Sequence, residues 1–261
     1  MPDLLLNKGL PFWVAFIATI FAAAIVGVLN GLLISRVKIN PLITTLGTLG
    51  LARGLAEILS QGTIVAPTDQ TAIPEWFSGL GSNSVAGIPV LLVVPVVLVA
   101  VGDILLRRGL FFREVFFLGG SERAARFAGI RVSYVQMNVY LLSALLAAIA
   151  GLLLDARFQS ATSNYGTGYE LQAIAAAVIG GAALSGGVGS LTGTLLATIL
   201  LALVQDAIIL NSVSPYWQDF ITGGILIVAV GLTLHGRRGG DLRQLVAMVA
   251  RRREKTPTRD P

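Results

Sequence analysis

The sequence contains no cysteine and only one histidine among its 261 residues. Without cysteine, neither a disulfide nor a thiolate metal site can form. A lone histidine supplies neither a nucleophile with its base nor a metal cluster, which argues against an enzyme that works within a membrane. We therefore predict no catalytic residue, no metal site and no cofactor. The histidine, His235, stands at the end of an apolar segment, and we interpret it as a membrane-interface residue.

Charged side chains are also scarce, at 13% of the residues against 54% that are hydrophobic. A soluble helical protein needs amphipathic helices with charged outer faces, whereas the long apolar segments here are apolar all round. Runs near the length of about 20 residues that a spanning helix requires cover 10–34, 42–60, 88–106, 134–154, 189–210 and 215–234, and a shorter run covers 170–185. We predict an all-α, polytopic membrane helix bundle of about seven spans. The membrane domain would cover 1–236 and a basic tail 237–261.

The basic residues are distributed unevenly along the chain. Of the 19 lysines and arginines, two are Arg36 and Lys38, six lie within 107–131, and eight lie within 237–259, whereas 61–87 has none. The positive-inside rule places the three basic regions in the cytoplasm and the loop at 61–87, which lacks lysine and arginine, outside. The net charge of +5 therefore indicates membrane topology and contact with anionic lipid rather than nucleic acid. An outward start and a cytoplasmic C-terminus require an odd number of crossings, which seven spans satisfy if 170–185 also crosses.

Small and charged residues inside the apolar runs predict contacts within and between helices. Gly27 and Gly31 are four residues apart, and small residues at this spacing let a second helix approach closely in lipid. Two oppositely charged pairs lie one helical turn apart, so either could form an ion pair: Arg53 with Glu57, and Asp103 with Arg107. For Arg53 and Glu57 we weigh a structural ion pair above a contact with substrate.

The stretch GGSERAARFAGI at Gly119–Ile130 has the features of a short capped helix. Ser121 is a good N-cap, Glu122 suits the positive end of the helix, and Gly129 is a natural stop. About two turns of helix are too short to be stable alone in water, so the segment should dock against another surface. Its residues sort onto an apolar face and a basic one: Ala124, Phe127 and Ala128 against Arg123 and Arg126. This arrangement indicates insertion into a groove of a cytosolic partner.

A second glycine cluster, SGGVGS at Ser185–Ser190, resembles a phosphate-binding loop only superficially. The phosphate-loop pattern requires a lysine that is absent here and a preceding strand, which the sequence does not predict. We expect instead that the apolar helix beginning at Glu170 stops at Gly180-Gly181. The chain would then re-enter the membrane region through a tight turn at the cytosolic side, where irregular backbone must be buried in protein or bathed in water.

Three motifs in order give the chain a resemblance to a known family. Gly119–Ile130, then GTGYEL at Gly166–Leu171, then IGGAALSGGVGSLTGT at Ile179–Thr194 resemble the permease subunits of bacterial ATP-binding cassette (ABC) importers for ribose, xylose and related monosaccharides. The resemblance runs from about residue 10 to about residue 233. Members of that family have about three further spans upstream, so it implies an N-terminally truncated piece of a permease with about ten spans.

The resemblance also implies a location and a set of partners. The chain would be a multi-pass protein of the bacterial inner membrane that works with a cytosolic ABC ATPase, a periplasmic sugar-binding protein and a second permease subunit, identical or paralogous. ATP hydrolysis would occur on the separate ATPase. The residues implied in coupling to that ATPase are Gly119, Gly120, Ser121, Glu122, Arg123, Ala124, Arg126, Phe127 and Gly129.

A neutral sugar would need hydroxyl, amide and aromatic groups along its path, because these form hydrogen bonds that can also be released. The candidates are Thr44, Thr45, Thr48, Asn138, Asn164, Tyr169, Gln172 and Gln205. Hydrogen bonding between helices is at least as good an explanation for each. Two other functions stay open: a permease for autoinducer-2 or a branched-chain amino acid, and an ion-coupled secondary transporter with Glu57 or Asp206 as the carrier.

Overall fold

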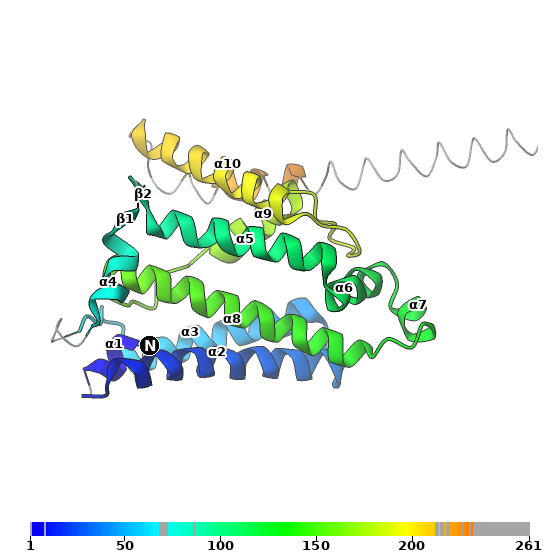
Figure 1. Ribbon diagram of the computed structural model, residues 1–261, viewed down its shortest axis with the longest axis horizontal. Coiled ribbons are helices and arrows are strands. Elements are labelled where there is room, and N and C mark those ends of the chain that lie inside the picture. The colour runs from blue at the N-terminus through cyan, green and yellow to red at the C-terminus, as the bar shows by residue number, and fades with distance from the viewer. Residues whose placement is uncertain are drawn as a thin grey trace, which may run out of the picture. The chain divides into compact units, whose positions relative to one another are not determined.

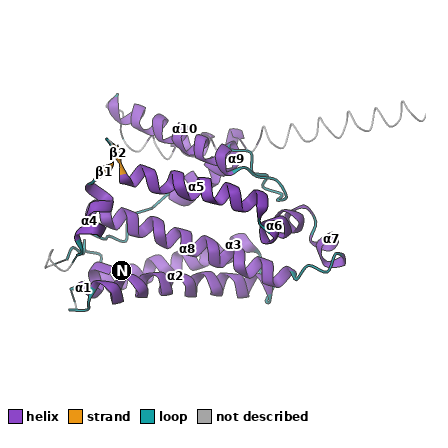
Figure 2. Cartoon of the chain, viewed as in Figure 1, coloured by secondary structure: helices purple, strands orange, loops and turns teal. Residues whose placement is uncertain are grey.

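The computed structural model shows a chain that is almost entirely helical where it is described (Figure 2). The described residues are 2–7, 9–67, 73–85, 87–211, 214, 217, 220–225, 227–229 and 231. The chain divides into two compact units, each of which is treated by itself: unit 1 is Met1–Thr167 with Ser185–Gly187, and unit 2 is Gly168–Leu184 with Val188–Pro261. His235 and the basic tail at 237–261 lie outside the described residues.

Five helices in the described part are long and apolar enough to cross a membrane. Unit 1 contains α2 (Phe12–Ser35), α3 (Pro41–Ser60), α5 (Val90–Arg108) and α8 (Val132–Phe158), and unit 2 contains α10 (Leu191–Leu210). Large apolar side chains such as Phe21 and Leu51 are exposed along them, as helices that face lipid require. The prediction of an all-α, polytopic membrane bundle is confirmed.

The other elements are short. They are α1 (Pro2–Leu6), α4 (Glu75–Ser82), the antiparallel pair β1 (Ser84–Val85) and β2 (Ile88–Pro89), α6 (Leu110–Gly120), α7 (Glu122–Phe127) and α9 (Tyr169–Ile179). As predicted, α9 stops at Gly180, which is its C-cap. Its 11 residues rise only about 16 Å, roughly half the hydrocarbon thickness. A further short apolar helix covers Phe220–Ala229, so crossings by 170–185 and 215–234 stay predictions.

The main packing of unit 1 joins α2 to α8, which lie side by side in Figure 1. Both glycines of α2 face α8 at very short range. A Cβ atom on Gly27 would lie 2.8 Å from Cβ of Ala144, and one on Gly31 would lie 2.9 Å from Cα of Met137. Only glycine permits so close an approach of the two backbones. The predicted close helix contact is confirmed.

One end of the α2–α8 pair is closed by aromatic side chains. Phe12 and Trp13 of α2 meet Trp76 and Phe77 of α4, with the two tryptophan rings stacked 5.5 Å apart. Phe77 is buried and packs in one cluster with Leu152 of α8. Tryptophan is typical of the membrane–water interface, so α4 caps this end of the helix pair at the interface.

Of the two predicted ion pairs one forms and the other does not. Arg107 Nε donates to Asp103 Oδ2 at 2.7 Å on α5. Arg53 and Glu57 of α3 are not among the ion pairs of the described residues, so that prediction was wrong. Side chains lean toward the N-terminal end of their helix, and an acid one turn before a base is therefore the better order. Asp103 precedes Arg107, whereas Glu57 follows Arg53.

Two buried carboxyl groups of unit 1 interact electrostatically. Asp3 of α1 is 2% exposed, and Asp155 near the end of α8 is 7% exposed. Burial first, and the neighbouring Asp155 carboxylate second, raise the pKa of Asp3 from 3.8 to about 7. Between these two values the folded chain keeps a proton that the unfolded chain releases, so stability falls as the pH rises.

We expect the thermal unfolding midpoint in detergent to decrease as the pH rises from 3.8 to about 7, because over this range only the folded chain holds the proton on Asp3. Asp3→Asn keeps a neutral hydrogen-bond donor at this position and should flatten that pH dependence. Asp103→Asn removes an ion pair from α5 and should leave the slope unchanged. Equal slopes in Asp3→Asn and the unsubstituted chain would contradict the assignment.

Candidate functional site

The predicted short helix is present as α7, and its caps are the residues that the sequence indicates. Ser121 Oγ accepts a hydrogen bond from the Ala124 N–H at 3.2 Å. After Phe127 the chain turns through Gly129 at φ 79°, with the Gly129 N–H bonded to Arg126 O at 3.1 Å and the Ile130 N–H bonded to Ala125 O at 3.0 Å. This pair of bonds is a Schellman motif, which needs a left-handed residue and therefore favours glycine.

The structure corrects the boundaries of this segment. Gly119 and Gly120 were placed with the coupling helix, but they form the last turn of α6, and the break comes at Ser121. Ser121 has an extended backbone and ends one helix while it caps the next. The helical part of α7 is six residues long, close to the two turns expected. A helix this short depends on its caps and on docking.

The face of α7 that packs against neighbouring helices is not the apolar face that the sequence predicted. Ala125 has no exposed surface, whereas Ala124 and Ala128 are exposed and Phe127 is 87% exposed. The helix contacts α6 and the start of α8. Ala125 therefore anchors α7, and the predicted apolar face is left available to a partner.

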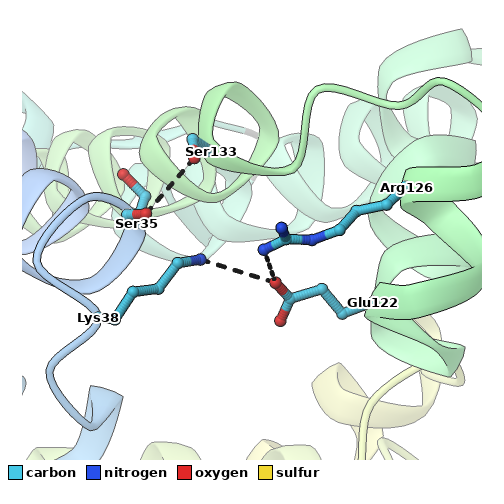
Figure 3. A network of polar contacts seen from close by, with 5 residues as sticks. All are labelled: Ser35, Lys38, Glu122, Arg126 and Ser133. Carbon is cyan, nitrogen blue, oxygen red and sulfur yellow. Dashed lines mark hydrogen bonds and ion pairs between the residues drawn. The ribbon is translucent and has the colours of Figure 1, made fainter.

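A charge network ties α7 to the link between α2 and α3. Glu122 Oε1 lies 2.5 Å from Arg126 Nη2 and 3.6 Å from Nζ of Lys38 (Figure 3). The hydrogen bond from Arg126, and to a lesser degree the charge of Lys38, lower the pKa of Glu122. Lys38 has φ 64°, an unusual backbone angle for a residue other than glycine, asparagine or aspartate. The sequence indicated a role for Glu122 at the helix end but not its distant partner.

Beside this network, the start of α8 meets the end of α2. Ser133 Oγ donates a hydrogen bond to Ser35 O at 3.4 Å (Figure 3). The α2 end, the α2–α3 link, α7 and the α8 start are thus joined by polar contacts in one small region of unit 1.

The glycine cluster of the third motif contacts the end of α6. Within unit 1, a Cβ atom on Gly119 would lie 2.5 Å from N of Gly187, and one on Gly187 would lie 2.9 Å from Cα of Gly120. Gly186 and Gly187 also have φ 83° and 80°, which favour glycine. Two motifs that are far apart in the sequence therefore meet backbone to backbone next to α7.

Unit 2 has its own close glycine contact between α9 and α10. A side chain on Gly180 would overlap the backbone of Thr194, and a side chain on Gly193 would overlap the carbonyl of Gly180. Gly193, in the first turn of α10, therefore lies directly against the end of α9. Ala175, Ala176, Ala197 and Leu201 form the buried cluster beside it.

Three of the eight polar candidates for a substrate path form side-chain hydrogen bonds only to the preceding helical turn. The Thr44 and Thr45 hydroxyls donate to Asn40 O and Pro41 O, both at 3.0 Å, and Asn138 Nδ2 donates to Tyr134 O at 2.8 Å. These bonds stay within the turn that precedes each residue, so they satisfy the polar group without a second helix.

Thr48 is different because it bonds across helices. Its hydroxyl donates to Asn30 Oδ1 of α2 at 2.9 Å. It lines an apolar groove of about 480 Å³ between α2 and α3, whose other walls are alanine, valine, leucine and isoleucine. A sugar needs several polar partners, which this groove does not offer.

The remaining candidates fall in different parts of the chain. Asn164 lies in the turn before Thr167 in unit 1, whereas Tyr169 is exposed on α9, and Gln172 and Gln205 are half-buried on α9 and α10 of unit 2. Because the candidates divide between the two units, their membership of one path stays a prediction. Glu57 and Asp206 are exposed, and among the described residues no group of three or more histidine, aspartate or glutamate side chains is arranged to hold a metal ion.

Comparisons with known proteins identify similar chains along most of this length. A family model for the branched-chain amino acid transport system permease component matches residues 3–230. The chain is 37% identical over 201 residues to the L-arabinose transport system permease protein AraH of Escherichia coli K12, which covers 77% of this chain and 60% of that protein. No solved structure matches the chain.

Two other similar proteins are also named for sugars. The chain is 36% identical over 201 residues to the ribose import permease protein RbsC of Bacillus subtilis 168, covering 77% of this chain and 62% of that protein. It is 34% identical over 214 residues to the galactose/methyl galactoside import permease protein MglC of Salmonella typhimurium LT2, covering 80% and 63%. The chain thus spans about three fifths of the length of these curated relatives.

The contact between Gly119 and Gly187 gives a prediction with a control one residue away. In Gly119→Ala the new methyl group would press on the Gly187 backbone, whereas in Gly120→Ala it would meet nothing within 4 Å. We expect Gly119→Ala to cost about 1–3 kcal/mol of stability and to lower the thermal unfolding midpoint in detergent. Gly120→Ala should be neutral or slightly stabilising. Equal midpoints for the two variants would disprove the contact.

Proposed function

Because the chain belongs to the family of branched-chain amino acid transport system permease components, we propose that it is the membrane-spanning permease subunit of an ABC importer that carries a monosaccharide. The observation that carries this proposal is the set of similar proteins, which are named for L-arabinose, ribose and galactose. Five long apolar helices supply the multi-pass membrane domain.

The proposal assigns transport, without chemistry, to this chain. A cytosolic ABC ATPase would hydrolyse ATP, a periplasmic sugar-binding protein would deliver the sugar, and a second permease subunit would complete the path. The distribution of basic residues supports a cytoplasmic C-terminus in the bacterial inner membrane. A basic tail at 237–261 would then lie near the anionic inner leaflet.

We assign the contact with the ATPase to α7. The exposed side chain of Phe127 supports this role, since aromatic side chains are enriched among the residues that anchor protein interfaces. Arg123 adds an exposed positive charge beside it. Arg126 is less suited to a partner contact because it already pairs with Glu122.

The same contacts would carry motion from the ATPase into the membrane helices. α7 continues from α6, leads directly into α8, and is tied to the α2–α3 link through Lys38 and Glu122. A displacement of α7 would thus act on three neighbouring elements at once. This tethering favours an ATP-driven permease over an ion-coupled transporter.

Uptake of labelled sugar tests the proposed function. We expect cells that produce the chain with the ABC ATPase and sugar-binding protein of the same genome to accumulate radiolabelled L-arabinose, D-ribose or D-galactose. Uptake should stop when the ATPase carries an inactivating substitution in its phosphate loop, and leucine should not accumulate. Sugar uptake that continues without an active ATPase would contradict the proposal and favour an ion-coupled transporter.

Removal of the Phe127 ring tests the proposed ATPase contact. Phe127→Ser should weaken co-purification of the ATPase by about tenfold or more, as expected for loss of a buried aromatic anchor at an interface. Membrane insertion and the yield of the chain should not change, because the side chain is exposed. Leu210→Ser is the matched control, since Leu210 is 83% exposed but lies at the end of α10. Equal co-purification of the two variants would refute the contact at α7.

A further inference from the structure

A pocket lined by basic side chains lies where α2 ends and α8 begins. It has a volume of about 480 Å³, and its lining includes Ser35, Arg36, Lys38, Arg126, Arg131 and Ser133. We call this the basic pocket. Its wall comes from the α2 end, the α2–α3 link, α7 and the start of α8, all within unit 1.

The positive charge of the basic pocket is only partly neutralised by the protein. Lys38 and Arg126 share a single carboxylate, that of Glu122. Arg36 and Arg131 belong to no ion pair in the part of the chain that the structure describes. Like charges that line one pocket repel one another, so the arrangement favours an anion between them.

Two helix ends modify this charge in opposite directions. Arg36 is the C-cap of α2, and the partial negative charge at this helix end offsets part of the positive charge of Arg36. Arg131 is the N-cap of α8, a helix of 27 residues whose first turn receives no side-chain cap. The amide groups at that end add positive potential to the basic pocket. The α8 end therefore strengthens the attraction for an anion on the side of Arg131.

The basic pocket also contains a hydroxyl without a partner. Ser35 lines it, is 2% exposed, and its Oγ has no hydrogen-bond partner. A buried hydroxyl that forms no hydrogen bond costs free energy. A ligand with several acceptor oxygens could satisfy it.

The position of the basic pocket along the helices brings it within reach of lipid phosphate groups. α2 and α8 are both long enough to span a membrane, and the basic pocket lies where one ends and the other begins. Lipid headgroups occupy this depth, and guanidinium groups bind phosphate oxygens in pairs.

We propose that the basic pocket binds a phosphate group. Arg36 and Arg131 supply the two unpaired charges, and Lys38 and Arg126 complete the ring. The phosphate comes either from a phospholipid headgroup or from free phosphate in the aqueous phase. In both cases it would join the α2–α3 link to α7 and neutralise the repulsion between them.

The test uses the full chain purified in an uncharged detergent and compares a lipid that carries a phosphate group with one that carries none. Native mass spectrometry would measure retention of phosphatidylglycerol against a galactolipid with the same acyl chains and no phosphate. In a second arm, the thermal unfolding midpoint would be measured with inorganic phosphate and with chloride at equal ionic strength. Phosphate-dependent retention identifies a lipid source, whereas a midpoint shift with inorganic phosphate alone identifies a soluble source.

The variants assign the binding to the basic pocket. Arg36→Gln with Arg131→Gln should reduce binding by about tenfold or more, as expected when charge-assisted hydrogen bonds are lost. Arg108→Gln is the control, because Arg108 is an exposed arginine at the end of α5 that does not line the basic pocket. If the double variant folds poorly, Arg36→Lys with Arg131→Lys keeps the charge and should bind more weakly than the unsubstituted chain. Binding that is unchanged in these variants, or reduced equally by Arg108→Gln, would overturn the proposal.

Discussion

The close pairing of α2 with α8 is the contact on which the rest of unit 1 depends. In lipid, helices gain no hydrophobic free energy by associating, so they rely on packing that only small residues allow. Gly27 and Gly31 bring the α2 backbone against Ala144 and Met137 of α8. This one line of contact fixes both ends of the pair: the aromatic cluster with α4 at one end, and the basic pocket with α7 at the other.

Near α7, glycines again allow two backbones to meet directly, and here the contact fixes the end of a helix. Gly119 and Gly187 touch without side chains between them, so α6 ends against a second stretch of backbone. α7 then projects from this rigid base, held by Ala125 and by the bond between Glu122 and Lys38. A short helix with a fixed base and an exposed tip can transmit displacement, because little of it can yield. In the proposed importer this rigidity would convert movement of the ATPase into movement of helix ends.

The sequence predicted the local features of this region well and the distant ones poorly. Run length located the long helices, and residue chemistry located both caps of α7 because capping is decided within a few residues. The burial of Ala125 and the partner of Glu122 depend on which surface α7 meets, and spacing along one helix does not contain that information. Likewise, the sequence groups Gly119 and Gly120 with the coupling segment, whereas they form the end of α6, because packing against Gly187 outweighs their low helix propensity.

The polar candidates of α3 show why a substrate path is harder to predict than a helix. A threonine in a spanning helix can satisfy its hydroxyl with a carbonyl of the preceding turn, as Thr44 and Thr45 do, so its presence does not require a ligand. Such a hydroxyl also suits transport. In the proposed importer, each bond offered to a sugar would replace a local one of similar strength, so the net gain in free energy would be small. Weak binding of this kind would allow release, which a permease needs as much as recognition.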